Sequence, residues 1–85
     1  MRRMTQAQNK QYRKLEICIE QLRDIIYKVY ATRNDVPFHD CYKAASIDIR
    51  QMYDDAINAL MIFENQMIAE GRGYRQNGRF YRNWS

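Results

Sequence analysis

Residues 32–37 read Thr32-Arg33-Asn34-Asp35-Val36-Pro37 and include the only proline of this 85-residue chain. Asn and Asp favour turns because their short side chains bond to nearby backbone, and a proline disfavours helix at the residue before it. The stretch therefore predicts a turn between two helices. Because so short a connection makes consecutive helices antiparallel neighbours, it also predicts a helical hairpin.

The segment before this turn predicts a helix over residues 5–31. Thr5 is followed three residues later by Gln8, which fits a capping box at a helix start. Apolar side chains then recur at steps of three and four residues: Tyr12, Leu15, Cys18, Ile19, Leu22, Ile25, Ile26 and Val29. That spacing places them on one face of a helix, so an amphipathic helix is expected.

The segment after the turn predicts a second helix over residues 38–70. Its apolar stripe includes Ala45, Ile49, Met52, Tyr53, Ala56, Ile57, Leu60, Met61, Phe63, Met67 and Ile68. Gly71 stands where a helix end favours left-handed backbone, so the helix should end at Glu70. An alternative places a short helix at 38–44 and restarts the chain at Ser46, which would serve as a helix cap.

Several aromatic residues flank the turn between the helices: Tyr27, Tyr30, Phe38, Tyr42 and Tyr53. The two that precede the turn lie off the main apolar stripe of the first helix. We expect these side chains to form a small cluster that closes the turn end of the hairpin. A role in binding a partner is the alternative.

The end of the chain has a different composition. Residues 71–85 read GRGYRQNGRFYRNWS and hold all three glycines. Within them, Asn77-Gly78 is a strong signal for a two-residue β-hairpin turn. Such a turn would pair Gln76 with Arg79, Arg75 with Phe80, and Tyr74 with Tyr81. The two tyrosines would share one face, and Arg75 and Phe80 the other, placed for a cation–π contact. Since an isolated hairpin is marginally stable, we expect mobility unless something packs on it.

Two helices cannot enclose a core, so each would leave much of its apolar stripe in water. The expected remedy is self-association, most simply a dimer that forms a four-helix bundle. The predicted fold is therefore all-α, a helical hairpin of residues 1–70 with the tail 71–85, dimerising into a bundle. The expected interface consists of Leu15, Ile19, Leu22, Ile26, Ile49, Met52, Ile57, Leu60, Phe63 and Met67. A different partner protein could cover the stripe instead.

The formal net charge of +4 conceals a partition along the chain. Residues 1–15 carry +5, residues 16–70 carry −5 and residues 71–85 carry +4. Antiparallel helices would bring both basic ends to one pole, with nine positive charges and no acid. Cations suit a helix C-terminus but not a helix N-terminus, where Arg2, Arg3 and Lys10 lie. A polyanionic partner is therefore predicted.

Arginines interleaved with aromatic residues favour nucleic acid with unpaired bases, because guanidinium groups bind phosphates and aromatic rings stack on bases. We expect phosphate contacts from Arg2, Arg3, Lys10, Arg13, Lys14, Arg72, Arg75, Arg79 and Arg82. We expect base stacking from Tyr74, Phe80, Tyr81 and Trp84. The alternative is a protein-interaction module whose tail docks in an acidic groove, because Arg and aromatic residues also dominate protein interfaces. An adaptor, a virion or assembly component, or an inhibitor of a nucleic-acid enzyme would fit this alternative.

Catalysis, cofactors and metals are not expected. His39 is the only histidine, and no Cys/His pair follows its neighbours Asp40 and Cys41 at zinc spacing. Cys18 is interpreted as core filler, too far along the hairpin from Cys41 for a disulfide. The chain lacks the constellations of a nucleophilic enzyme and the glycine loop that cradles phosphate.

No segment has the length of an apolar membrane span, and no apolar run follows the basic N-terminus as in a secretory signal. Together with two cysteines and no CxxC motif, this predicts a cytoplasmic protein. The layout of a short helical chain with a basic tail resembles that of small proteins of phages and mobile elements. No motif in the chain assigns it to a family.

Overall fold

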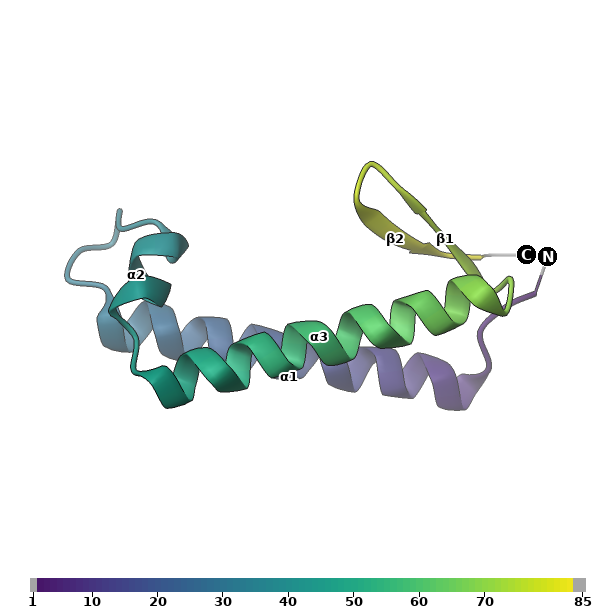
Figure 1. Cartoon of the computed structure of the whole chain (residues 1–85), viewed down its shortest axis with the longest axis horizontal. Helices are drawn as coiled ribbons and strands as arrows, with labels where there is room; N and C mark the ends of the chain where they lie inside the picture. Colours follow the sequence, from purple (N-terminus) through teal and green to yellow (C-terminus); the bar gives the residue numbers. More distant parts are fainter. Residues whose placement is uncertain (1, 84–85) are drawn as a thin grey trace.

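The structure is a computed structural model, and it describes residues 2–83 (Figure 1). Its elements are α1 (Gln6–Tyr30), α2 (Phe38–Ala44), α3 (Ile47–Ala69), β1 (Gly73–Gln76) and β2 (Arg79–Arg82). Helices α1 and α3 lie side by side and antiparallel, and α2 and the β-hairpin rise from the same side of this pair at opposite ends (Figure 1). The predicted mostly helical architecture with a C-terminal hairpin is confirmed. Dimerisation stays a prediction.

The start of α1 is fixed by the predicted capping box. The Thr5 hydroxyl accepts a hydrogen bond from the Gln8 N–H at 3.1 Å, and the Gln8 side chain accepts one from the Thr5 N–H at 2.8 Å. Two of the backbone donors that a helix start leaves unpaired are thereby satisfied. The helix ends at Tyr30, with the N–H of Ala31 donating to the Tyr27 carbonyl. Both ends agree with the predicted range.

The second predicted helix is wrong as a single element, because the chain breaks between α2 and α3. Ala45 and Ser46 have extended backbone, with ψ values of 154° and 156°. The Ser46 hydroxyl caps α3 by accepting from the Ile49 N–H at 3.3 Å, and the Ser46 N–H donates to the Tyr30 hydroxyl at 3.3 Å. The break lets α2 fold back and bury Cys41, which a continuous helix could not do. The alternative with a cap at Ser46 is the correct one.

The aromatic cluster at the turn end is confirmed, and α2 is the element that assembles it. The Phe38 ring lies 5.2 Å from that of Tyr27 and 5.3 Å from that of Tyr53. The Tyr42 hydroxyl donates to Asp54 at 2.8 Å, and this bond raises the pKa of Tyr42 above that of an ordinary tyrosine. These contacts dock α2 on both long helices.

The C-terminal end of α3 is closed by the predicted glycine. Gly71 has a φ of +73°, which side chains rarely tolerate. The N–H of Gly71 donates to the Ile68 carbonyl at 3.0 Å, and that of Arg72 donates to the Met67 carbonyl at 2.8 Å. This pair of bonds is a Schellman motif. It reverses the chain and directs β1 back over α3.

The buried apolar core is small, as expected for two long helices. Among the described residues it consists of Met4, Ile19, Leu22, Ile26, Cys41, Ala45 and Met67. The radius of gyration is 15.3 Å, whereas about 12 Å is typical of a compact domain of this length. Cys18 was predicted to fill the core, but it is exposed because α1 turns that side of the helix away from α3. The molecule is therefore an elongated rod with a thin core.

The residues expected at an oligomer interface fall into three groups. Ile19, Leu22, Ile26 and Met67 are buried within the chain. Leu15, Ile49, Ile57, Leu60 and Phe63 are half-buried. Met52 is exposed. Much of the predicted interface is therefore the contact between the chain's own two long helices.

Candidate nucleic-acid interface

The C-terminal hairpin has the predicted register. The residue pairs are Gly73 with Arg82, Tyr74 with Tyr81, Arg75 with Phe80, and Gln76 with Arg79. At the turn, Asn77 and Gly78 have φ values of 54° and 77°, the left-handed backbone of a type I′ turn. Because side chains alternate along a strand, the hairpin has two distinct faces. We call the face with Phe80 the inner face and the face with the two tyrosines the outer face.

The inner face packs on the helices through an aromatic chain. The Phe80 ring lies 5.5 Å from the Tyr12 ring, which in turn lies 6.0 Å from the Phe63 ring. A Cβ atom on Gly73 would lie 2.6 Å from the Phe80 ring, so only glycine leaves room for this ring position. Burial is the main cause that raises the pKa of Tyr12. The hairpin therefore packs on the helices. The sequence predicted a mobile hairpin unless such packing exists.

Two arginines of the inner face bond to the protein's own side chains. Arg75 donates to Glu64 at 2.9 Å and to Asn65 at 2.7 Å, instead of lying over Phe80 as predicted. Arg82 donates to Asn9 at 2.8 Å, and its guanidinium lies 5.6 Å from the centre of the Tyr12 ring. Both side chains thus hold the hairpin against the helices.

The two ends of the chain meet beside the hairpin. Arg72 donates to Glu70 at 2.7 Å and to the backbone carbonyl of Arg3. The Asn83 side chain donates to the carbonyl of Arg2 at 2.9 Å and to that of Gly71 at 2.8 Å. We call this end of the molecule, formed by residues 2–14 and 64–83, the basic pole. The predicted meeting of the two basic segments is confirmed.

The sequence predicted a basic pole without acidic residues, and this prediction is wrong. Glu64 pairs with Arg75 and Glu70 pairs with Arg72. The hydrogen bond from Arg72 is the main cause that lowers the pKa of Glu70. Glu64 lies near the end of α3 and Glu70 caps it. The charge partition along the chain had assigned both acids to the acidic middle. Arg72 and Arg75 are therefore neutralised within the basic pole itself.

The outer face of the hairpin is exposed to solvent. The rings of Tyr74 and Tyr81 stack at 5.4 Å between centroids with 20° between their planes. Their exposed fractions are 47% and 41%. Arg79 is exposed and lies two residues from Tyr81, hence on the same face. This face therefore holds an exposed aromatic pair and an exposed arginine.

A cleft of about 240 Å³ lies at the basic pole between the N-terminal segment, the start of α1 and the end of β2. Its lining residues are Arg3, Met4, Gln6, Asn9, Arg82 and Asn83. The lining thus includes two arginines and the N-terminal end of α1, and such a helix end carries partial positive charge. An anionic group of phosphate size suits this chemistry.

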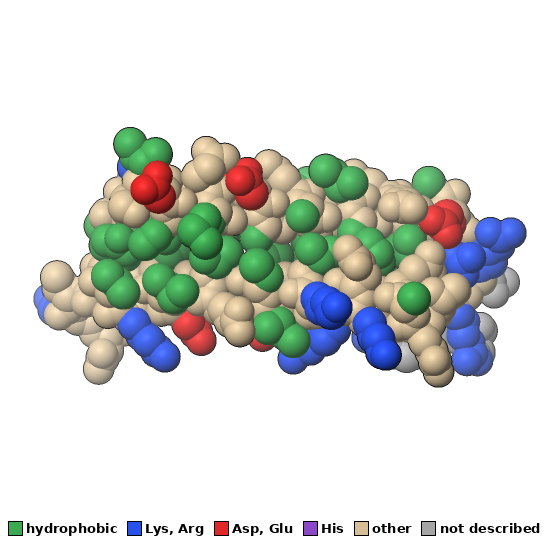
Figure 2. All heavy atoms as spheres, turned by 90° about the horizontal axis from the view of Figure 1, so that it is seen from below, with side chains coloured by type: hydrophobic (Ala, Val, Ile, Leu, Met, Phe, Trp, Pro, Cys, Tyr) green, Lys and Arg blue, Asp and Glu red, His purple; other side chains and the backbone are tan. Residues whose placement is uncertain are grey.

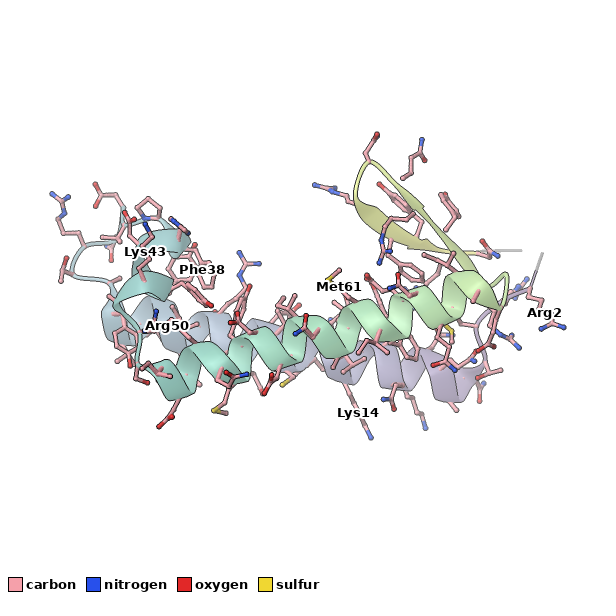
Figure 3. The ribbon with its side chains drawn as sticks, viewed as in Figure 1. Arg2, Lys14, Phe38, Lys43, Arg50 and Met61 are labelled. Carbon is pink, nitrogen blue, oxygen red and sulfur yellow. The ribbon has the colours of Figure 1, made fainter. Side chains whose placement is uncertain are left out.

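The remaining predicted residues do not converge on the hairpin. Lys14 points away from it on the opposite side of the helix pair (Figure 3). Lys10 is exposed one helical turn before it, and Arg13 lies 3.7 Å from Glu20. Trp84 falls outside the described residues. Asn9 accepts from Arg82, and Asn83 donates to the backbone of Arg2 and Gly71. Neither was predicted, because no sequence pattern marks an amide that bonds to a residue distant in the chain.

Across residues 2–83, no three His, Cys, Asp or Glu side chains gather in a way that could hold a metal ion. Each helix in this part of the chain is too short or too polar to cross a membrane. No known protein family, curated protein or solved structure matches the chain.

Proposed function

We propose that the protein is a small, non-enzymatic, oligomeric nucleic-acid-binding protein that takes RNA or single-stranded nucleic acid at its basic pole. The main support is that the two faces of the hairpin have different surroundings. The inner face is used for packing, whereas the outer face leaves Tyr74, Tyr81 and Arg79 to solvent. A stacked, exposed tyrosine pair beside an arginine has no role in the chain's own core.

Unpaired bases are the ligands that suit this face. A base that is already stacked and paired within a duplex cannot reach a flat aromatic pair, whereas an unpaired base can lie on it. Each base stacked on an aromatic side chain contributes roughly 1–3 kcal/mol. Arg79 would contact the adjoining phosphate, and the cleft lined by Arg3 and Arg82 would take a second one.

The role of the other cations follows from their partners. Arg72 and Arg75 form ion pairs with Glu70 and Glu64, respectively. They therefore stabilise the basic pole and contribute less to the attraction of an anionic ligand. Exposed cations on the first segment, among them Arg2 and Lys10, would add electrostatic attraction without positioning. Such contacts release counterions, so binding should weaken as salt rises.

The test is a titration of a labelled single-stranded oligonucleotide, followed by fluorescence anisotropy at several salt concentrations. Tyr74→Ala should raise Kd by about 5–150-fold, the equivalent of one lost stack. Arg79→Ala should lower the slope of log Kd against log salt by about one, because one phosphate contact is lost. Arg33→Ala is the matched control, because Arg33 is an exposed arginine at the opposite end of the rod.

Two results would refute the proposal: no binding at about 50 mM salt, or a binding affinity that does not change with salt. An effect of Arg33→Ala as large as that of Arg79→Ala would also contradict it.

A protein-interaction module is the second candidate, because exposed tyrosine and arginine are also the residues that dominate binding hot spots. An acidic groove on a partner protein would receive the same outer face. A pull-down with nuclease-treated extract separates the two. Capture of a protein that survives nuclease treatment and is lost in Tyr74→Ala would favour this second function.

A further inference from the structure

We infer that the face of the α1–α3 pair opposite the hairpin binds a second copy of this chain, in an antiparallel two-fold dimer whose axis passes near Cys18. Figure 2 views this face, which we call the underside, and shows hydrophobic side chains in a band along both long helices. The inference does not rest on nucleic-acid binding, because the hairpin is on the other side of the molecule (Figure 1).

Helix geometry identifies the exposed residues of the underside. Lys14 points to this side of α1 (Figure 3), and residues four and eleven positions further on return to the same side of a helix. Those positions are Cys18 and Ile25, and Val29 lies one turn beyond. All three are exposed. An apolar edge of α1 therefore faces water in the isolated chain.

On α3 the underside is marked by Met52. Met61 points to the upper side in Figure 3. Nine residues make two and a half turns of helix, so Met52 lies on the opposite side from Met61. Their exposed fractions, 57% and 48%, are similar. Met52 thus completes the underside, and Met61 provides a matched residue on the other side.

The surface area indicates how much the isolated chain leaves uncovered. The chain exposes 6389 Å², whereas a compact monomer of 10.3 kDa would expose roughly 5,400 Å². The excess is about 1,000 Å². A standard interface buries about 800 Å² on each partner. A second copy seated on the underside would therefore bring the chain close to the exposure of a compact protein.

The charge distribution selects the relative orientation of the two copies. The half of the rod with the basic pole, residues 2–19 and 57–83, has nine basic and three acidic residues, a formal charge of +6. The other half, residues 20–56, has five basic and seven acidic residues, a formal charge of −2. An antiparallel dimer sets the +6 half of each copy against the −2 half of the other. A parallel dimer would set the two +6 halves together.

Antiparallel symmetry gives the central residue of α1 a special position. Residue 18 is the midpoint of α1, which runs from Gln6 to Tyr30. In a two-fold interface, a residue near the axis faces its own copy. The two Cys18 thiols should therefore lie close together across the axis. The two hairpins then point outward at opposite ends of the dimer, where each remains open to a ligand.

The experiment measures the mass of the full chain by sedimentation equilibrium without nucleic acid, and its reaction with a short bis-maleimide. We expect twice the chain mass of 10.3 kDa, and a covalent dimer joined through Cys18. Cys41 is fully buried and should not react. Cys18→Ser should abolish the covalent dimer and retain the non-covalent one.

Charged substitutions test the surface itself. Met52→Glu should raise the dimer dissociation constant about 100-fold, because a two-fold interface loses two apolar contacts. Met61→Glu should change it by less than about threefold, the usual scale for an unrelated surface site. Far-UV circular dichroism checks that each variant is helical, and the cross-link of the unmodified chain needs no variant.

Three results would overturn the inference. The first is a monomeric unmodified chain at concentrations of about 100 μM, where an interface of this size should be formed. The second is a dimer that Met61→Glu weakens as much as Met52→Glu does. The third is a stable dimer whose Cys18 thiols do not cross-link, which would refute the antiparallel arrangement.

Discussion

Replacing Gly73 by alanine probes the contact that holds the hairpin on the helices. The new Cβ atom would lie 2.6 Å from the Phe80 ring and 2.8 Å from the Tyr81 carbonyl oxygen. Ordinary carbon contacts are about 3.5–4.0 Å, so the ring would have to move by roughly 1 Å. Because that movement takes Phe80 away from Tyr12, we expect a loss of about 1–3 kcal/mol, the usual cost of overpacking.

The expected loss of stability is opposite in sign to the effect that alanine would have without the clash. Gly73 is not in the left-handed region of backbone angles, and glycine weakens a strand interior. Without the clash, alanine would therefore stabilise β1 by about 0.5–1 kcal/mol. The assay is thermal unfolding at fixed protein concentration, where each kcal/mol lowers Tm by about 4–8 °C in a domain of this size.

A double-mutant cycle assigns the cost to the ring. In a Phe80→Ala background the clash between the new Cβ atom and the Phe80 ring is absent, whereas the close approach to the Tyr81 carbonyl remains, so the two substitutions should couple by about 1 kcal/mol. A stability for Gly73→Ala that equals or exceeds that of the unmodified chain would show that the hairpin does not rest on the helices through Phe80.

Substitutions at two positions test the ends of α3. Ser46→Ala removes the hydroxyl that accepts the Ile49 N–H and should cost about 1 kcal/mol in a denaturant titration, whereas Ser46→Asp should retain most of the stability. At the other end, the hydrogen bond from Arg72 lowers the pKa of Glu70 below its ordinary 4.5. The carboxylate should therefore stabilise the fold above pH 4.5 and lose that contribution as the pH falls through its depressed pKa. Stability of Glu70→Gln, measured from neutral pH into acid, should be lower at neutral pH and converge with the unmodified chain in acid. Parallel pH curves would contradict that role of Glu70.

Local patterns predicted the elements that depend on neighbouring residues. Thr5 with Gln8, Gly71, and Asn77-Gly78 each act through bonds or backbone angles within a few positions, and each is found as predicted. The hairpin register followed from its turn, because a two-residue turn allows one pairing of the flanking strands.

The helix break was harder to predict, because Ser46 has two local options. It is acceptable within a helix and better as a cap, and the apolar spacing continues across it. The decision comes from residues distant in the chain, since the Tyr30 hydroxyl accepts the Ser46 N–H and α2 buries Cys41 on folding back. A window along the sequence contains neither contact.

The candidate site likewise depends partly on local sequence patterns and partly on contacts between distant residues. The meeting of the two basic ends could be predicted from sequence alone, because a short turn between two helices makes them antiparallel. The side chains that remain exposed to a ligand, in contrast, depend on how the hairpin packs against the helices. Packing of Phe80 on Tyr12 commits one face of the hairpin to the fold, and Glu64 and Glu70 take up two arginines. The outer tyrosine pair, Arg79 and the apolar underside remain exposed, because packing decides which faces are covered and sequence spacing decides only which residues share a face.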